Sequence, residues 1–528
     1  MFNNPPKLLQ NSDQIMSIIK EQYEQYVAQL QKIQDLNSTL ALLHWDNEVN
    51  APSKGASLRG QQIATLSATV HEWATSSELG ELLLHLNANR QALSENEAKN
   101  VELSLAIFNK EKKLPIKFVT AFSKAKTKAF QAWLNARKAK DYTLYKNELR
   151  VMVDLLKEKA RLIGYKEHPY DALIDEFEKG ATVAQLDILF GAVRQQLVAF
   201  AKEIKVKGQP SEKAFLNRHY DKQKQWDFGI ELLTQMGYDF EAGRQDLSEH
   251  PFTTTFSSKD VRITTRIEEN TPLEMIGSCI HEGGHALYEM GLPSKQYGLP
   301  LGMATSLGIH ESQSRLWENQ VGLSLAYWKV NFPRMQERFP EALEGITVEQ
   351  FYKAINQLEP NYIRTIADEI HYHLHVLIRY EIEKGLMDGT YDVENLDLVW
   401  NKKYKDFLGL EVPDATKGIL QDVHWAEGLF GYFPTYSLGS FYAAQFYSKA
   451  KEDLPNLEEE IAKGNMTPLL EWLRYHIHQH GQKYTSEELC QRITGEGLNL
   501  SYFMAYAREK YAVIYEFETK HYSVENPN

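Results

Sequence analysis

Residues 271–291 read TPLEMIGSCIHEGGHALYEMG, and they are the most informative stretch of this sequence. Thr271, Pro272 and Glu274 together predict the start of a helix. Thr can cap a helix, Pro suits its first position, and Glu three residues after the cap can complete a capping box. Gly291 is a reasonable helix end. The sequence therefore predicts one helix over these residues.

The pentapeptide His281-Glu-Gly-Gly-His285 lies inside this predicted helix. Histidines four positions apart lie on one helix face about one turn apart, where both can bind one tetrahedral cation. Glu282 lies beside them and is near enough to accept a proton from water at such a cation. The alternative is a chance match, but 17 histidines in 528 residues predict fewer than about 0.1 such matches. The pattern favours a catalytic metal site.

Gly283 and Gly284 stand between the two histidines. Each costs about 1 kcal/mol in a helix interior relative to Ala. We expect a compensating close approach of another chain or of the substrate backbone.

A candidate for the third metal ligand lies downstream, in the segment His310-Glu-Ser-Gln-Ser-Arg315. Glu311 would complete a His2Glu site with water in the fourth position, the arrangement of catalytic zinc. A surface ion pair with Arg315, four residues on, explains Glu311 equally well. Glu289 and Glu318 are lesser candidates for the third ligand.

Composition excludes several classes of protein. Lys and Arg number 58 and Asp and Glu 71, so the formal charge is −13, and basic clusters typical of nucleic-acid binders are missing from the sequence. No apolar run approaches the roughly 18–20 residues of a membrane span, and the N-terminus shows no secretory signal pattern. Two cysteines, Cys279 and Cys490, fit a reducing compartment. We expect a cytoplasmic protein that binds neither nucleic acid nor membrane.

Helical periodicity dominates the first half of the chain. One stripe of apolar side chains with spacings of three and four comprises Ile15, Ile19, Tyr23, Tyr26, Leu30 and Ile33. Similar patterns recur over residues 95–130 and 141–163. Repeats and long Gly/Ser linkers are missing, so we expect one domain over residues 1–528, with a helical part at 1–245, the site at 246–445 and a helical part at 446–528.

Residues 250–267, HPFTTTFSSKDVRITTRI, break the helical pattern. They are rich in Thr, Phe, Val and Ile, and they predict two short strands around the turn at residues 257–260. The predicted fold is therefore mainly α, with a small β-sheet next to the metal-binding helix.

Several motifs together resemble the thermostable carboxypeptidase family, also called carboxypeptidase Taq. In chain order they are His44-Trp45-Asp46 with Pro52 and Arg59, His250-Pro-Phe, Asp260-Val-Arg262-Ile-Thr264, HEGGH at 281–285, His310-Glu-Ser-Gln, Ile363-Arg364-Thr-Ile-Ala367-Asp368, and Gly418-Ile-Leu-Gln421-Asp422-Val-His424-Trp425. The resemblance runs from about residue 40 to beyond residue 440 and is far more specific than the HExxH pattern alone.

This resemblance implies a large helical zincin-type peptidase with a deep central groove. It implies a metal-dependent carboxypeptidase that releases single C-terminal amino acids from peptides, and a homodimer. The implied cofactor is one divalent ion, zinc or cobalt. Its ligands would be His281, His285 and Glu311, with Glu282 as general acid and base, which favours metal ligation over the ion pair for Glu311.

Two arginines are candidates for binding the substrate's C-terminal carboxylate, because a guanidinium can donate two parallel hydrogen bonds to it. Arg364 resembles the family residue with this role, and Arg262 is the second candidate. The alternative for Arg364 is a structural salt bridge with Asp368 four residues on.

Histidines and tyrosines supply the remaining candidates. His250 and His424 are similar to family histidines that line the groove, although a lone His is more often structural. Gln421 and Asp422 would fix His424 or hold the substrate terminus. Tyr436 resembles a tyrosine that donates a hydrogen bond to the oxyanion, with Tyr432 as the alternative.

Glycines and proline within residues 428–447 predict a loop, at least before residue 440. The strand around residues 260–265 is expected to align the peptide through main-chain hydrogen bonds.

Two other functions remain open at this point. A metal-dependent oligopeptidase that cuts internal bonds would share the fold and the metal site. A helical scaffold without catalysis is the second, but the base Glu282 speaks against it.

Overall fold

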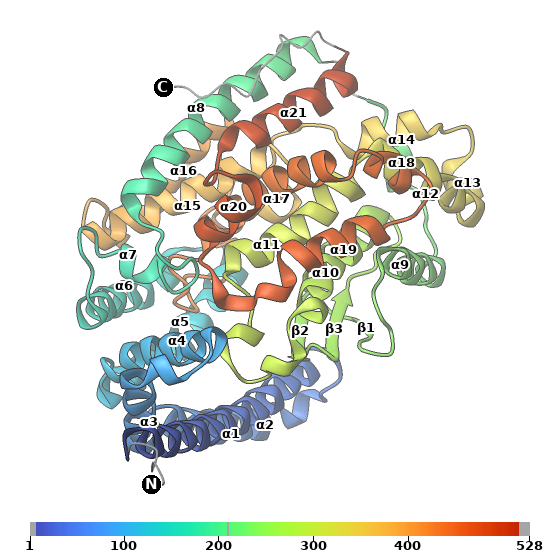
Figure 1. Cartoon of the computed structure of the whole chain (residues 1–528). Helices are drawn as coiled ribbons and strands as arrows, with labels where there is room; N and C mark the ends of the chain where they lie inside the picture. Colours follow the sequence, from blue (N-terminus) through green and yellow to red (C-terminus); the bar gives the residue numbers. More distant parts are fainter. Residues whose placement is uncertain (1–6, 209–210, 517–528) are drawn as a thin grey trace.

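The apolar stripe near the N-terminus forms one face of a 43-residue helix, α1 (Lys7–Val49). The computed structural model describes residues 7–208 and 211–516 (Figure 1). Ile19, Tyr23, Tyr26 and Ile33 are buried, whereas Ile15 is 52% exposed. The predicted helix is confirmed, and the buried part of its stripe begins at Ile19 among the residues whose burial is described.

Further helices follow in the N-terminal part of the chain. They are α2 (Ala56–Ala74), α3 (Ser77–Ala88), α4 (Glu95–Lys112), α5 (Ile116–Ala139), α6 (Thr143–Ile163), α7 (Asp171–Ile174), α8 (Val183–Lys207) and α9 (Lys222–Met236). Apolar side chains of α1, α3 and α4 form a small core of their own with Leu299, whereas α5 to α9 contribute to the large core. Figure 1 shows α1 to α4 at one end of the molecule.

The sheet has three strands, β1 (Gln245–Leu247), β2 (Thr253–Ser257) and β3 (Asp260–Thr265), in the order β1-β3-β2. The predicted hairpin is confirmed, with β2 and β3 antiparallel, and β1 pairs with β3 in parallel. Because β3 lies in the middle, both of its edges are paired. The expectation that residues 260–265 align a peptide is therefore wrong, and β1 and β2 are the edge strands.

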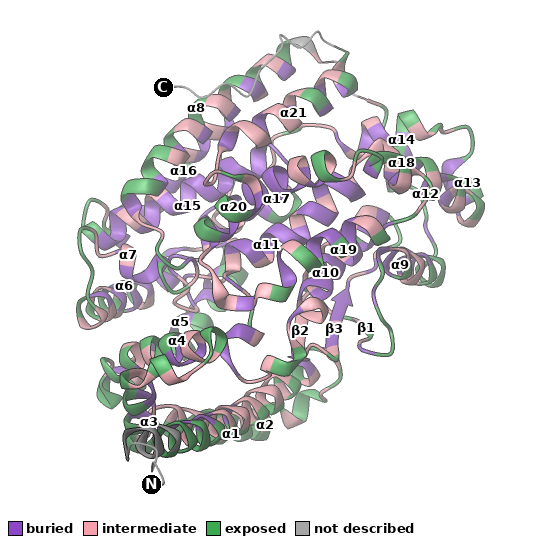
Figure 2. Ribbon diagram, in the orientation of Figure 1, coloured by how far each residue is buried: buried purple, intermediate pink, exposed green. Residues whose placement is uncertain are grey.

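The second half of the chain is again helical. Its helices are α10 (Pro272–Gly291), α11 (Leu307–Arg315), α12 (Leu325–Arg338), α13 (Pro340–Leu343), α14 (Val348–Ile355), α15 (His371–Asp388), α16 (Leu396–Leu408), α17 (Phe433–Asp453), α18 (Leu457–Ala462), α19 (Thr467–His476), α20 (Ser486–Thr494) and α21 (Leu500–Tyr515). Figure 2 shows that α10, α11, α15 and α17 are mostly buried in the centre of the molecule. The mainly α prediction with a small sheet beside α10 is confirmed.

The aromatic segment differs from its prediction. Helix α17 begins at Phe433, so the loop expected before residue 440 ends seven residues earlier. Pro434 occupies the first turn, where its missing N–H costs nothing. Gly439 lies inside the helix. A Cβ at this position would come within 2.6 Å of the Glu311 side chain, so close packing explains why the residue is a glycine. These residues mark close packing rather than a break.

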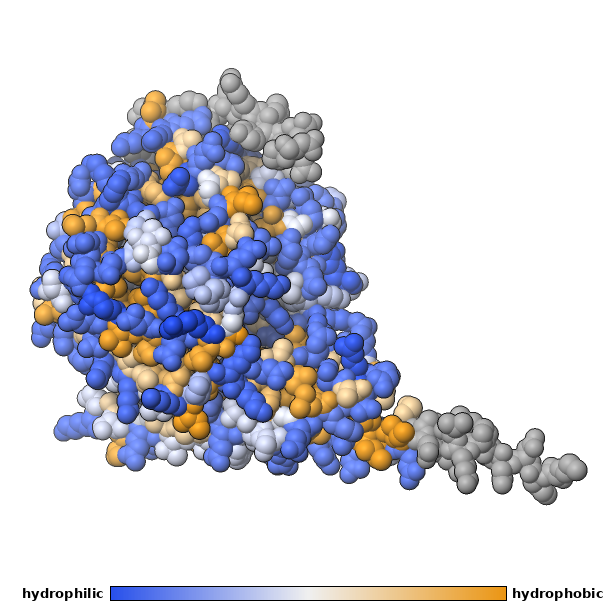
Figure 3. Space-filling model, turned by 90° about the vertical axis from the view of Figure 1, so that its left-hand side faces the viewer, coloured by the Kyte–Doolittle hydropathy of each residue, from blue (hydrophilic) through white to orange (hydrophobic). Residues whose placement is uncertain are grey.

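The described helices include none that is long and apolar enough to cross a membrane. Figure 3 shows one face of the molecule, where hydrophilic side chains alternate with scattered apolar groups.

Candidate metal centre

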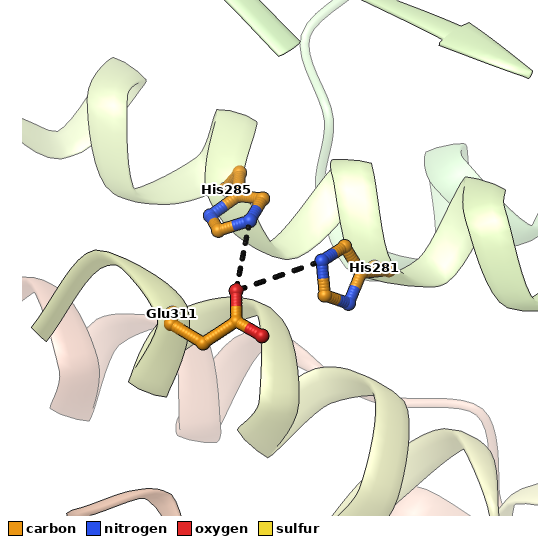
Figure 4. A group of neighbouring side chains, drawn as sticks. All are labelled: His281, His285 and Glu311. Carbon is orange, nitrogen blue, oxygen red and sulfur yellow. Dashed lines mark ion pairs between the residues drawn. The ribbon is translucent and has the colours of Figure 1, made fainter. Parts of the chain in front are cut away.

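Two helices bring three ligand-type side chains to one point. His281 and His285 project from α10 towards Glu311 on α11 (Figure 4). The Nε2 atoms of His285 and His281 lie 3.4 and 3.7 Å from Oε2 of Glu311. Two ligand atoms that each lie about 2.1 Å from a tetrahedral ion are about 3.4 Å apart. The three donor atoms therefore fit a single divalent ion, and the predicted residues form a candidate metal site.

Helix α10 has the predicted bounds but not the predicted cap. Thr271 precedes it with a ψ of 66°, away from the extended conformation of a capping residue, and its side chain accepts no capping hydrogen bond. Instead the N–H of Glu274 donates to the Thr271 carbonyl at 3.1 Å. The capping box is wrong, although the helix itself is confirmed.

The glycines of the pentapeptide allow close packing, as the sequence predicts. A Cβ on Gly284 would lie 2.7 Å from the Cα of Ser314 on α11. A Cβ on Gly283 would lie 2.8 Å from the side chain of Leu233 on α9. A Cβ on Gly439 of α17 would lie 2.6 Å from the Glu311 side chain. The crossing at Gly284 lets Glu311 approach the two histidines, so the close partner is the chain itself.

The geometry of Glu311 is compatible with both sequence interpretations, because its two oxygens have different partners. Oε2 faces the two imidazoles, and Oε1 accepts a hydrogen bond from Nε of Arg315 at 2.7 Å. The carboxylate is 6% exposed. Burial opposes its charge, but Arg315 and His281 outweigh this and lower the pKa of Glu311 below its usual range. The ion pair therefore orients the carboxylate and keeps it ionised.

Carboxylates stand behind both histidines. Nδ1 of His281 lies 2.7 Å from Oε2 of Glu318, which also accepts from Nη1 of Arg315 at 3.0 Å. Nδ1 of His285 lies 2.6 Å from Nδ1 of His310, and Nε2 of His310 lies 2.8 Å from Glu289. Outer partners of this kind fix ring orientation in metal sites. Neither Glu318 nor Glu289 belongs to the group of three donors that could hold one ion.

A π-helical turn, η6 (Leu316–Gly322), follows α11 and carries Glu318. Such turns are rare and occur frequently at functional sites. Burial opposes the charged form of His281, but Glu318 and Glu311 outweigh it and raise the pKa of this imidazole to about 9. Burial and His310 lower the pKa of His285 to about 3. The two histidines therefore have different electrostatic surroundings.

Replacing Glu318 by Gln is expected to weaken metal binding about 10- to 100-fold, the usual effect of losing an outer partner. Gln keeps the shape but loses the charge that faces His281 and Arg315. The measurement is metal affinity by competition with a chelator of known affinity. The control is Glu274→Gln. Glu274 also lines the cleft and lies on α10 about two helical turns before His281, so this variant loses the same charge away from the candidate ligands. Equal affinity in the parent and Glu318→Gln would contradict this role.

A cleft of about 1230 Å³ opens over these residues. Its lining includes the three candidate ligands, Glu282, His250, Arg364, Tyr432 and Tyr436. Glu282 is 7% exposed, and burial raises its pKa. His250 is exposed at the cleft surface. The structure therefore gathers most of the predicted site residues around one cavity.

Arg364 lies in a 3₁₀ turn, η7 (Arg364–Ile366), rather than in an α-helix, so the i+4 spacing does not bring it to Asp368. Its Nε and Nη2 atoms donate to Oδ1 of Asp422 at 3.1 and 3.0 Å. Arg379 donates to the other oxygen of Asp422 at 2.7 Å. Asp368 instead accepts from the backbone N–H groups of Ile370 and His371. Two buried guanidiniums share one carboxylate, so this group of three carries a net positive charge, and Arg364 is its member in the cleft lining.

Arg262 lies away from the cleft. It pairs with Asp260 at 2.9 Å, and its guanidinium lies 4.8 Å from the ring centroids of both Trp45 and Phe256. These contacts join α1 to the sheet. Arg262 is not among the residues that line the cleft, so the structure does not bring it to the candidate metal site.

Tyr436 has His424 as its hydrogen-bond partner, with 3.0 Å between Nε2 and the phenol oxygen. Arg364 lies over the Tyr436 ring, 4.6 Å from its centroid. Burial raises the pKa of Tyr436 well above its ordinary value and lowers that of His424 to about 3. Tyr436 therefore keeps its proton and His424 is neutral, and the tautomer of His424 decides which of the two donates in their hydrogen bond.

Sequence reasoning missed several members of this site. Thr253 of β2 donates a hydrogen bond to Glu282 at 2.6 Å, and Arg379 shares Asp422 with Arg364. These partners lie 29 and 43 residues apart along the chain. Helical or strand spacing relates only near neighbours, so no local pattern joins them.

Comparisons with known proteins agree with this geometry. The family model "Carboxypeptidase Taq (M32) metallopeptidase" matches residues 25–511. The chain is 40% identical over 493 residues to thermostable carboxypeptidase 1 of Thermus thermophilus, covering 91% of this chain and 96% of that protein. It is 38% identical over 490 residues to carboxypeptidase 1 of Bacillus subtilis, covering 92% and 97%.

A solved structure gives the same result. The crystal structure of the M32 carboxypeptidase from Deinococcus radiodurans R1 superposes with a TM-score of 0.92 at 37% sequence identity, covering 94% of this chain and 100% of that chain. With a family match over most of its length and a His-His-Glu candidate metal site, this chain belongs to the carboxypeptidase Taq (M32) family and is a metallocarboxypeptidase.

Proposed function

We propose that this enzyme removes single residues from peptides with a free C-terminus, with His281, His285 and Glu311 as ligands of one divalent ion. The observation that carries the proposal is the convergence of these three donors beside Glu282 in one cleft. Zinc fits the His2Glu donor set best, and cobalt is the alternative, since such ligands suit several first-row ions. When bound, the ion would polarise the scissile carbonyl and lower the pKa of the attacking water.

Glu282 is the general base and then the general acid. Its carboxylate takes the proton from the attacking water and passes it to the leaving amine. Burial raises the pKa of Glu282, which supports its role as a base because the buried carboxylate then takes up a proton more readily than an exposed one. Neither oxygen of Glu282 belongs to the candidate ligand set.

Tyr436 stabilises the negative charge that develops on the carbonyl oxygen. Its O–H group stays protonated, and this role requires the His424 tautomer in which Nε2–H donates to the phenol oxygen 3.0 Å away, so that the hydroxyl hydrogen is free for the oxyanion. A donor fixed before the reaction costs no reorganisation in the transition state. His424 is thus a positioning residue, and His250 at the cleft surface contacts the substrate.

Arg364 binds the terminal carboxylate of the peptide. Support comes from the surplus positive charge of Arg364 and Arg379 around Asp422, which attracts an anion in a site shielded from water. We do not propose Arg262 for this role, because its guanidinium pairs with Asp260 and stacks on the Trp45 ring. Edge strand β2, beside Glu282, replaces β3 as the strand that aligns the peptide backbone.

Arg364→Ala is expected to lower kcat/KM on a peptide with a free C-terminus by about 10- to 150-fold, the effect of losing a charge-assisted hydrogen bond. The amidated form of the same peptide, already a poor substrate, should change little. Arg364→Lys should recover only part of the rate, because an ammonium lacks the planar fork. Mass spectrometry of the products gives both rates.

Arg262→Ala is the matched control, since it removes a guanidinium outside the cleft lining. It should leave the ratio of free to amidated rates unchanged even if folding suffers. If the parent enzyme cut free and amidated peptides equally well at internal bonds, the oligopeptidase alternative would replace exopeptidase action. Absence of a stoichiometric divalent ion in purified active protein would contradict the metal assignment.

We also propose that the enzyme is a cytoplasmic homodimer. The two cysteines are buried and unpaired, which suits a reducing compartment. Apolar side chains exposed on α1 and α2, such as Ile15 (52%) and Leu58 (68%), offer surface that a second copy would cover. Sedimentation analysis measures the oligomeric state directly.

A further inference from the structure

Thr253 of edge strand β2 forms side-chain hydrogen bonds to Glu282 of helix α10. Its hydroxyl lies 2.6 Å from Oε2 of Glu282 and 3.2 Å from the backbone carbonyl of the same residue. The shorter contact is a hydrogen bond to a carboxylate, the stronger of the two types. Among the described residues, Thr253 is the one whose side chain donates to the Glu282 carboxylate.

A glutamate side chain has several rotatable bonds, and a base acts only when its oxygen faces the proton it removes. Glu282 is buried at the cleft wall, yet a helix fixes only its backbone. The Thr253 hydroxyl holds Oε2 and leaves Oε1 with its lone pairs for the attacking water. Preorganisation of this kind requires a supporting residue on a rigid element, and β2 is held by its pairing with β3.

We propose that Thr253 is a positioning residue for the hydrolytic reaction, which orients the Glu282 carboxylate towards the attacking water. The proposal rests on the assigned role of Glu282 as the base. Thr253 itself does not exchange the reacting proton, because its hydroxyl serves only as a fixed donor. The strand therefore contributes to catalysis through its side chain as well as through its edge.

Thr253→Val removes the hydroxyl with little change in shape, and Val is favourable in strands, so folding should survive. We expect kcat to fall about 10-fold, the lower end for losing a hydrogen bond to a charged group, with KM changed less than about twofold. Metal content and melting temperature should match the parent. Thr253→Ser keeps the hydroxyl and should restore most of kcat.

Thr254→Val is the matched control. Thr254 is the next residue of the same strand and pairs with Arg262 of β3, and alternation directs its side chain to the other face of the sheet. The Thr254 side chain is not part of the cleft lining and the substitution leaves the strand backbone in place, so it should leave kcat unchanged. A general effect of Val on the strand would lower both rates.

A double substitution separates positioning from structural support. If Thr253 acts only through Glu282, Thr253→Val should cause no further loss in a Glu282→Gln background, because the base it orients is already gone. Full loss in both backgrounds would overturn the proposal, as would parental kcat in Thr253→Val or failure of Ser to rescue. A fully active Glu282→Gln enzyme would instead refute the proposed function, so the two failures are distinguishable.

Discussion

Glu282→Gln is expected to lower kcat by about 10²- to 10⁴-fold, the usual range for losing a general base. Gln preserves the shape of the side chain and its contact distance to Thr253, but it cannot accept a proton from water. Because Glu282 is outside the candidate ligand set, metal content should equal that of the parent. The measurement is single-residue release from a free C-terminus, with metal analysis of the same sample.

Glu311→Ala provides the contrast for this experiment. It removes one of the three donors, so lost metal affinity should be its primary defect. Parental turnover in a metal-replete Glu282→Gln enzyme would refute the role of Glu282. Metal binding as tight as in the parent after Glu311→Ala would move the third ligand to Glu318 or Glu289.

Tyr436→Phe is expected to lower kcat by about 10²- to 10³-fold, as losing one oxyanion donor does. The substitution removes one hydroxyl and leaves the ring, which packs near Arg364 and Tyr432. Folding and metal content should survive. Rates on one peptide, measured at saturating substrate, report the loss in the chemical step.

Tyr432→Phe is the matched control, because its ring centroid lies 5.2 Å from that of Tyr436 in the same cleft. It should retain most of the activity. If Tyr436→Phe were fully active and Tyr432→Phe impaired, the donor would be Tyr432. Parental rates in both variants would show that neither tyrosine stabilises the oxyanion.

Local pattern was sufficient wherever near neighbours in the sequence decide the structure. Helix α10 and the two histidines on its face follow from 3.6-residue periodicity, and the β2–β3 hairpin follows from alternation around a turn. The same local rules gave wrong results where tertiary packing competed. Gly439 lies in a helix, and the close approach of Glu311, rather than a chain break, explains why it is a glycine. Thr271 does not cap α10, because its backbone departs from the extended conformation of a capping residue.

Motif resemblance extended the prediction to the family and its activity, which the comparisons confirm. It could not supply the environment of each residue. Arg262 and Arg364 both stand in motifs, yet one stacks on Trp45 outside the cleft and the other lies over Tyr436 inside it. Sequence spacing does not distinguish these two positions.

The sequence by itself determined the helical architecture, helix α10 with its two candidate metal ligands, and the family. Tertiary structure alone decided which oxygen of Glu311 faces the histidines, which carboxylate holds Arg364, and which hydroxyl orients Glu282. The physical reason is the distance along the chain over which each kind of interaction acts. Backbone hydrogen bonding and side-chain periodicity act over a few residues, whereas these contacts join segments 26 to 58 residues apart through close packing of α10, α11, β2 and the 364–422 region.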